Sequence, residues 1–316
     1  MNNTFLNDVD KGLSSTPKYL LSKYFYDKIG DALFVDIMNM PEYYLTRAEF
    51  DIFKNQTQNL IEALKLKKDT FFELIELGAG DGTKTKQLLK ALYTANYNFN
   101  YVPIDISQNA LDQLKSSVNS ELPNINTTPK QGDYFNVLSS LKQSNHPKVI
   151  LFLGSNIGNL NDILAQDFLT KLADSLQAND KVCIGLDLIK SEKIVLPAYN
   201  DSQGITRRFN LNLLERINKE FDANFDIDTF KHQPEYTEDE GIARSYLVST
   251  KSQTVTIKAL NKSFHFMEGE RIHTETSRKY NDAILNGFLK KTSLKVIDKL
   301  MDSNQYFADY ILNKDE

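Results

Sequence analysis

The sequence is short of cysteine, histidine and long apolar or basic runs, and each shortage excludes a class of protein. One cysteine cannot form an internal disulfide, and four scattered histidines with one cysteine offer no metal-ligand cluster. No run of about eighteen apolar residues occurs, so no segment is expected to span a membrane. A net charge of −5 without a long basic run argues against a nucleic-acid partner.

The N-terminal segment and the single cysteine bear on where the protein works. Residues 1–18 are polar and lack the apolar centre of a signal peptide, so we expect a mobile or draped segment there. Cys183 lies in an apolar run and is expected to be an inert core thiol. These features predict a cytoplasmic protein, with a monomer as the default state. Its 316 residues, 41% of them apolar, suffice for one large domain or two.

A glycine-rich turn follows the apolar run 72–77. Three alternating glycines, Gly78, Gly80 and Gly82, come first, and residues 88–92 then place leucines on one helical face. This pattern predicts a strand, a tight turn and a helix. A backbone that must bend sharply and approach a ligand closely cannot carry Cβ atoms, and the helix that follows directs its amide groups at that ligand.

Three ligand classes compete for this turn. A dinucleotide fingerprint requires a third glycine where Thr83 stands, and a phosphate loop requires a lysine directly after Gly82, whereas Thr83 separates Gly82 from Lys84. S-adenosylmethionine has no phosphates and tolerates the looser Glu-x-Gly-x-Gly form that residues 76–80 have. A tight strand-to-helix turn without any ligand remains the alternative.

Further apolar segments alternate with helical patterns. Strands are expected at about 100–104, 126–130, 148–153 and 181–188, with two final strands at about 294–299 and 305–312. Strand–helix alternation with continuous apolar strands predicts an open, mostly parallel sheet with helices on both faces.

Several residues follow the carboxyl ends of these strands, where open parallel sheets bind ligands. Asp105 can accept hydrogen bonds from ribose hydroxyls, although an ordinary carboxylate at a helix start is the alternative. Asp133 and Tyr134 form an acidic–aromatic pair that suits an adenine ring. A second glycine turn occupies residues 154–159, Gly-Ser-Asn-Ile-Gly-Asn.

The remaining segments follow a different pattern. Residues 190–280 are richer in charge, mix helical and strand patterns, and predict a separate lobe. Aromatic residues gather at 24–26, at Phe34 and at 41–44, where core packing competes with contact to a small polar ligand. Thr46 followed by Glu49 is a capping-box pattern, which predicts the start of a helix.

Six stretches together carry a family resemblance. They are residues 24–27 (Tyr-Phe-Tyr-Asp), 41–47 (Pro-Glu-Tyr-Tyr-Leu-Thr-Arg), 76–80 (Glu-Leu-Gly-Ala-Gly), 152–159 (Phe-Leu-Gly-Ser-Asn-Ile-Gly-Asn), 198–201 (Ala-Tyr-Asn-Asp) and 274–277 (Thr-Glu-Thr-Ser). Over nearly its whole length the chain resembles the histidine-specific, S-adenosylmethionine-dependent methyltransferases of ergothioneine biosynthesis. The resemblance implies an α/β fold: a Rossmann-like, mostly parallel sheet of seven strands with a second α+β domain. We expect the methyltransferase domain at residues 61–189 and 286–316, and a substrate-binding domain at residues 1–60 and 190–285.

The resemblance also implies roles for individual residues. The implied cofactor contacts are Gly78, Gly80, Lys84, Asp105, Asp133 and Tyr134. The implied substrate contacts are Asn159 and Tyr199 for the carboxylate, Glu275 and Ser277 for the imidazole nitrogens, and Phe34, Tyr43, Gly154, Thr206 and Ser245 elsewhere in the pocket. Tyr26 is the implied catalytic residue, because it would orient the amine. The implied reaction is methylation of the α-amine of L-histidine by S-adenosylmethionine, giving Nα-trimethylhistidine (hercynine).

One position departs from the family. Ser245 stands where the family places a methionine against the substrate ring, and a smaller polar residue would widen the pocket. The same reaction on another amino acid or small amine therefore stays open. Two alternatives of other classes are a nicotinamide-dependent oxidoreductase and a non-catalytic ligand-binding protein.

Overall fold

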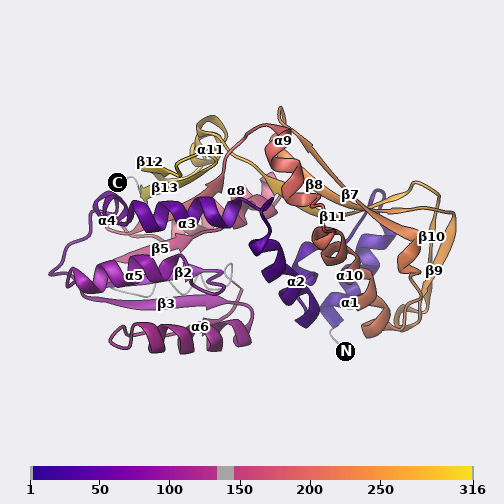
Figure 1. The fold of residues 1–316 in the computed structure, drawn as a ribbon, viewed down its shortest axis with the longest axis horizontal. Coiled ribbons are helices and arrows are strands. Elements are labelled where there is room, and N and C mark those ends of the chain that lie inside the picture. The colour runs from indigo at the N-terminus through magenta and orange to yellow at the C-terminus, as the bar shows by residue number, and fades with distance from the viewer. Residues whose placement is uncertain (1–2, 134–145, 315–316) are drawn as a thin grey trace. The chain divides into compact units, whose positions relative to one another are not determined.

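A computed structural model of the chain describes residues 3–133 and 146–314 (Figure 1). Contacts divide the chain into two compact units. Unit 1 comprises residues 1–44 and 190–278, and unit 2 comprises residues 45–189 and 279–316. The boundaries expected at residues 60 and 285 therefore differ from the observed ones.

The boundary shifts because of two helices. Helix α3 (Leu45–Asn55) and helix α4 (Thr57–Ala63) pack against the sheet of unit 2. Ile52 and Phe53 of α3 are fully buried there among strand residues. The sequence shows these apolar residues, but their spacing does not say which core they enter.

Unit 2 is built on a seven-stranded sheet with the order β12-β13-β6-β5-β2-β3-β4. Its strands are β2 (Phe72–Leu77), β3 (Phe99–Asp105), β4 (Lys130–Gln131), β5 (Lys148–Phe152), β6 (Lys181–Asp187), β12 (Leu294–Met301) and β13 (Phe307–Lys314). The five strands from β4 to β6 are mutually parallel, and β13 is antiparallel to both β6 and β12. The α/β fold with a mostly parallel seven-stranded sheet is thus confirmed.

Helices bury both faces of this sheet. Helices α3, α4, α5 (Thr85–Thr94) and α6 (Gln108–Glu121) contribute to one apolar core, and α8 (Asp162–Ser175) and α11 (Asp282–Leu289) to the other. Consecutive strand residues alternate between the two cores, as Leu74 and Ile75 do, because side chains of a strand point to opposite faces. Cys183 is fully buried in the first core, and burial raises the pKa of its thiol, so it is an inert core residue as expected.

Unit 1 combines helices with a mostly antiparallel sheet, in which only the pairing of β1 with β11 is parallel. Its helical segments are α1 (Asn3–Ser14), η1 (Ser22–Tyr24), α2 (Lys28–Asn39), α9 (Glu192–Val195), η3 (Leu196–Tyr199), α10 (Ile205–Phe221), η4 (Ile227–Thr229) and η5 (Lys258–Leu260). Its four-stranded sheet has the order β1 (Lys18–Tyr19), β11 (Arg271–Arg278), β8 (Ile242–Ser249) and β7 (Phe230–Thr237). Strands β9 (Gln253–Ile257) and β10 (Lys262–Phe266) form a hairpin.

Two expectations for unit 1 need correction. The N-terminal segment is not draped: Phe5, Val9 and Leu13 recur every four residues on α1 and are buried in the core of unit 1. Strand β7 was not expected, because Pro234 interrupts its pattern. Proline is tolerated there because β7 is an edge strand, whose outward amides have no ladder partner to lose. Within the described residues, no helix is both long and apolar enough to cross a membrane.

Candidate active site

The glycine turn after β2 leaves room for a ligand at one position. Gly78, Gly80 and Gly82 have φ angles of +72°, +54° and +66°, a region that favours glycine. A Cβ on Gly82 would lie 2.3 Å from the Leu114 Cδ1 atom, so this glycine allows α6 to pack closely. A Cβ on Gly80 would meet nothing within 4 Å. Packing therefore explains Gly82, whereas Gly80 opens onto free space that a ligand can enter.

The end of β3 lies directly beside this turn. Asp105 accepts the Gly80 N–H at 3.3 Å through Oδ2 and the Ser107 N–H at 2.9 Å through Oδ1. Each carboxylate oxygen keeps a further lone pair, so ribose hydroxyls can still bind. The Gly132 N–H donates to the Asp105 carbonyl oxygen at 3.0 Å, which brings the neighbouring Asp133 to the same edge. Tyr134, also expected to contact the cofactor, lies outside the described residues.

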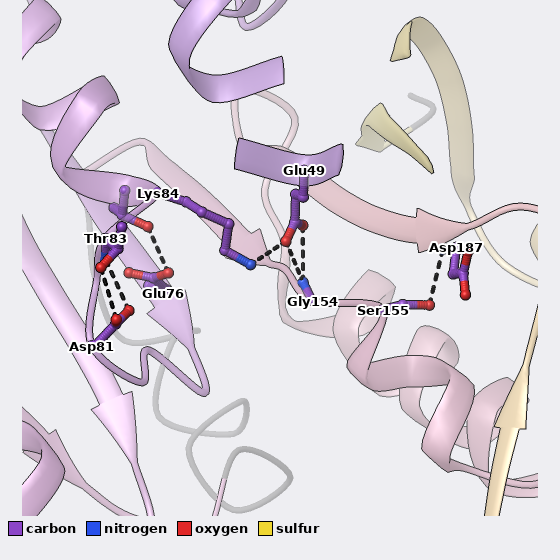
Figure 2. Close-up of polar contacts among 9 residues, drawn as sticks. Glu49, Glu76, Asp81, Thr83, Lys84, Gly154, Ser155 and Asp187 are labelled. Atoms are coloured by element: carbon purple, nitrogen blue, oxygen red, sulfur yellow. Dashed lines mark hydrogen bonds and ion pairs between the residues drawn. The ribbon is translucent and has the colours of Figure 1, made fainter. Parts of the chain in front are cut away.

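Lys84, at the N-cap of α5, is held by a carboxylate that the sequence did not mark as functional. Its ammonium pairs with Glu49 of α3, and the Glu49 side chain is fully buried while that of Lys84 is 20% exposed. Glu49 also accepts the Gly154 N–H at 2.9 Å and 3.0 Å, as Figure 2 shows. Burial works against the ammonium, yet the Glu49 carboxylate holds the pKa of Lys84 above its ordinary value.

The second glycine turn adjoins the first because β5 pairs with β2. Gly154 and Ser155 both have left-handed φ angles, +73° and +56°, and η2 (Asn156–Asn159) follows. The Asn156 Nδ2 atom lies 3.2 Å from where a Cβ on Gly78 would stand. Asn156 is therefore a further polar group between the two turns, and sequence analysis missed it. Asn159 ends η2 and is exposed.

A buried carboxyl group lies just before the first glycine turn. The Thr85 hydroxyl donates to Glu76 Oε1 at 2.6 Å, and the Tyr101 hydroxyl donates to Glu76 Oε2. Burial raises the pKa of Glu76 to about 7, although these two hydrogen bonds oppose the change. Glu76 thus titrates close to neutral pH.

In unit 1, the predicted residues Tyr199 and Thr206 join one polar network. The Tyr199 hydroxyl donates to Ser277 Oγ at 2.8 Å. The Thr206 hydroxyl lies 3.1 Å from the Tyr199 carbonyl oxygen and 2.7 Å from the Asp201 carboxylate. Asp201 caps α10 by accepting the N–H groups of Ile205 and Thr206, both at 2.8 Å. Burial opposes its charge, but these bonds lower the pKa of Asp201, so the cap is anionic.

Strands β8 and β11 add Ser245 and Glu275 to this network. The two residues face each other in the antiparallel register, and the Ser245 hydroxyl donates to Glu275 Oε2 at 3.2 Å. Ser277 lies two residues beyond Glu275 and therefore points to the same side of the sheet. The structure thus brings Tyr199, Ser245, Glu275 and Ser277 together. Ser245 is buried and engages the carboxylate of Glu275.

An aromatic cluster forms around Phe209, a buried residue of α10. The Tyr26 and Phe34 ring centroids lie 5.8 Å and 6.0 Å from that of Phe209, and the Phe34 and Tyr43 centroids are 6.4 Å apart. Phe209 follows Thr206 by three residues on α10, so the aromatic cluster and the polar network adjoin the same helix face. Tyr26 is 41% exposed, and its hydroxyl-bearing ring is accessible to a ligand.

The predicted residues are divided between the units. The described cofactor candidates, with Gly154 and Asn159, belong to unit 2, and all other substrate candidates belong to unit 1. In unit 2, hydrogen bonds join Gly80 to Asp105 and link Lys84 to Gly154 through Glu49, whereas none of the contacts described above includes Asn159. The chemistry available is an acidic and amide-rich edge suited to an adenosine group in unit 2, and a carboxylate, hydroxyls and aromatic rings suited to an amino acid in unit 1.

Comparison with known proteins agrees with this chemistry. The family described as "Histidine-specific methyltransferase, SAM-dependent" matches residues 5–314. The histidine N-alpha-methyltransferase of Mycolicibacterium smegmatis is 36% identical over 273 residues, which cover 86% of this chain and 83% of that protein. The protein of the same name from Mycobacterium tuberculosis is 34% identical over 287 residues, covering 91% and 88%. Ergothioneine biosynthesis protein 1 of Schizosaccharomyces pombe is 30% identical over 304 residues, covering 93% of this chain and 39% of that protein.

Proposed function

Because this chain belongs to the family of histidine-specific, S-adenosylmethionine-dependent methyltransferases, we propose that it methylates the α-amine of L-histidine. Three successive transfers would give Nα-trimethylhistidine (hercynine), a place in ergothioneine biosynthesis. The observation that carries the proposal is the Glu275 carboxylate, which shares one face of β11 with Ser277, the acceptor of the Tyr199 hydroxyl. In this polar surrounding, the Glu275 carboxylate can accept a hydrogen bond from a substrate whose side chain carries a ring N–H. A nicotinamide-dependent oxidoreductase is not supported by this family membership.

In the proposal, unit 2 holds the cofactor. Asp105 accepts hydrogen bonds from the ribose hydroxyls, and Asp133 accepts one from the adenine amino group. The open space at Gly80 lets the cofactor lie close to the backbone of the turn. Lys84 contacts the carboxylate of S-adenosylmethionine, the one anionic group of that molecule. The activated methyl group is supplied by the cofactor's sulfonium. The residues of the chain have only to bind, orient and exclude water.

In this proposal, residues of unit 1 bind the amino-acid substrate. Glu275 accepts the imidazole N–H, and Ser277 contacts the other ring nitrogen. Tyr199 binds the substrate's carboxylate, and Thr206, Phe34 and Tyr43 complete the pocket wall. From unit 2 we retain Asn159 and Gly154 as proposed substrate contacts.

Tyr26 is the proposed catalytic residue. An α-amine is largely protonated at neutral pH and must lose a proton before it attacks, so a nearby hydroxyl or water must accept or relay that proton. The partly exposed Tyr26 ring lies edge-on to Phe34, 5.4 Å between centroids, and in this proposal its hydroxyl orients the amine. Alignment of an attacking group in this way supplies roughly 7–11 kcal/mol of barrier lowering.

Ser245 favours a second candidate within the same reaction class. Its hydroxyl occupies one side of the Glu275 carboxylate, where a larger apolar side chain would otherwise face the substrate. Such a site accommodates another amino acid if the side chain of that amino acid fills the added space and donates a hydrogen bond to Glu275. The reaction on the α-amine would be the same.

Calorimetry tests the proposal directly. L-histidine is titrated into the protein saturated with S-adenosylhomocysteine, followed by L-phenylalanine, which has a ring without an N–H. Histidine should bind more than tenfold tighter than phenylalanine, because a site built to receive an N–H leaves its acceptor unpaired with the isostere. Mass spectrometry of a reaction with S-adenosylmethionine should then show three methyl additions. Binding of a different amino acid would identify that amino acid as the substrate and keep the reaction class. No binding by any amino acid would refute the proposal.

The proposal includes a monomeric, cytosolic enzyme acting on a free amino acid. The fully buried thiol of Cys183 is consistent with a reducing compartment, since it has no disulfide role. Sedimentation equilibrium and cell fractionation test these two points, and a dimer or a membrane-bound fraction would contradict them.

A further inference from the structure

Glu49 connects three separate segments of unit 2 from a fully buried position. Its carboxylate receives the Gly154 N–H of the turn after β5 and the ammonium of Lys84 at the start of α5 (Figure 2). Both partners are proposed ligand contacts, whereas Glu49 itself is inaccessible to a ligand because its side chain is 0% exposed. Charge-assisted hydrogen bonds of this kind are short and strongly directional. Glu49 is thus placed behind the site and fixes two groups that face it.

The fold reserves space for this carboxylate. A Cβ on Gly185, in the middle of β6, would lie 2.1 Å from Glu49 Oε1 and 3.0 Å from Asp309 Oδ1. Glycine in a strand interior weakens the strand, and its presence often marks a close approach by another group. Here the approaching groups are two carboxyls, one from α3 and one from β13, and the ring of Phe307, whose Cε1 atom would also lie 3.0 Å from that Cβ.

The charges in this cluster leave Glu49 as the counterion of Lys84. Asp309 is fully buried, and among the described residues neither of its oxygens has a hydrogen-bond partner. Burial, followed by the nearby Glu49 charge, raises the pKa of Asp309 well above its usual range, which favours the protonated form of this carboxyl. Burial likewise raises the pKa of Glu76 to about 7. The carboxylate in contact with the ammonium is that of Glu49.

We propose that Glu49 is a positioning residue for cofactor binding, which holds the Lys84 ammonium in the geometry that receives S-adenosylmethionine and also anchors the turn at Gly154, a proposed substrate contact. Without this carboxylate, the Lys84 ammonium would lose its buried partner, and the Gly154 N–H would lose its acceptor. Lys84 would then reorient toward solvent or give up its proton, and it would bind the cofactor's carboxylate poorly. The inference rests on the proposed roles of Lys84 and Gly154 and is independent of which amino acid is methylated.

A double-mutant cycle read by ligand binding tests the inference. S-adenosylhomocysteine is titrated calorimetrically into the wild type, E49Q, K84M and the double variant E49Q/K84M. We expect E49Q to weaken binding about tenfold or more, the order associated with loss of a charged hydrogen bond. If Glu49 acts through Lys84, the double variant should bind no more weakly than the poorer single variant. Fully additive losses, or an E49Q affinity within twofold of wild type, would overturn the proposal.

A matched control separates positioning from a general loss of stability. Lys148 and Asp180 form another ion pair with both side chains fully buried, at 3.0 Å, and these residues start β5 and precede β6, at the strand ends opposite the site. D180N should lower the unfolding temperature but leave S-adenosylhomocysteine affinity within twofold of wild type. An affinity loss in D180N equal to that in E49Q would assign both effects to stability and refute the proposal.

A second variant covers the case in which E49Q does not fold. E49D keeps the charge but withdraws the carboxylate by one methylene, so it should raise the dissociation constant of S-adenosylhomocysteine by about tenfold through misplaced hydrogen bonds. It should also raise KM for S-adenosylmethionine more than KM for the amino acid, a split that a purely structural defect would not give. Unchanged cofactor binding in E49D would refute the proposal. Failure of the wild type to methylate histidine would refute the proposed function only, because these titrations contain no amino acid.

Discussion

Replacement of Glu76 by glutamine should make unit 2 less sensitive to pH between 4.5 and 7. Burial raises the pKa of Glu76 from 4.5 to about 7 in the folded protein. Below pH 4.5 both the folded and the unfolded chain hold the proton. Above pH 4.5 the unfolded chain releases it, while the folded protein keeps it until about pH 7. Stability is therefore present at low pH and is lost as the pH rises toward the folded pKa.

The magnitude follows from the two pKa values. The difference is about 7 minus 4.5, or roughly 2.5 units, and one unit corresponds to about 1.4 kcal/mol. Glu76 should thus lower the free energy of unfolding by about 3 kcal/mol between pH 4.5 and pH 7. Glutamine resembles the protonated acid, because both are uncharged and both carry a hydrogen-bond donor on one of the two terminal atoms. With either side chain, the hydroxyl of Thr85 or of Tyr101 must accept a hydrogen bond from that donor instead of donating one. The variant therefore lacks the pH-dependent loss.

Urea unfolding of the wild type and E76Q at intervals from pH 4.5 to 7.5 measures the effect. Circular dichroism is the appropriate signal, since the chain contains no tryptophan. The unfolding free energy of E76Q relative to wild type should rise by about 3 kcal/mol across this range. E62Q is the control, because Glu62 is an exposed residue of α4 that contacts Gln58 at the surface. A difference between E76Q and wild type that stays constant with pH would refute a buried, uncharged Glu76.

Three further predictions concern single residues. E275A should weaken histidine binding more than tenfold by calorimetry, given roughly 1.5–3 kcal/mol for a hydrogen bond to a charged group, and unchanged affinity would remove Glu275 from the site. D309N should gain stability relative to wild type as the pH rises above the ordinary aspartate range, because burial raises the pKa of Asp309 and the unfolded chain releases this proton at a lower pH than the folded protein does. Urea unfolding checks this, and a gain that shrinks as the pH rises would contradict it. G82A should lower the unfolding temperature more than G80A, because only Gly82 meets Leu114, while G80A should mainly weaken S-adenosylhomocysteine binding; the reverse order in calorimetry would contradict the assignment.

The sheet and its glycine turns could be predicted because their signals are local. The run 72–77 places Phe72 and Leu74 in one core and Ile75 and Leu77 in the other, as expected of a strand covered on both faces, and the glycines that end it have the positive φ angles that their pattern implies. Ser107 caps α6, accepting the Ala110 N–H at 3.2 Å, which is a signal that also depends on neighbouring residues alone. Local rules gave most strands with bounds close to the observed ones, but β4 comprises only Lys130–Gln131, whereas a strand was expected at about 126–130.

The parts that sequence analysis missed depend on distant contacts. Glu49 fits a surface capping box with Thr46, and nothing local shows that it is buried against Lys84 and Gly154, 35 and 105 positions away. Phe209 has the spacing of an ordinary core residue, and its aromatic partners come from the N-terminal segment. Strand β11, which carries Glu275 and Ser277, was not expected from its own pattern, so those two residues were indicated by the family resemblance alone.

The position of β13 has a consequence for how the protein is made. This strand lies inside the sheet, between β12 and β6, yet it is formed by residues 307–314 and leaves the ribosome after every other strand. Until then the edge of β6 is unpaired, which is a template for aggregation, and Glu49 lacks the neighbour that Asp309 provides. Unit 1 ends at residue 278 and can therefore fold while unit 2 is still incomplete. A chain that ends before Phe307 would leave the edge of β6 unpaired. We therefore expect C-terminal truncation to destabilise unit 2 more than unit 1, and chaperones to be needed mainly for the folding of unit 2.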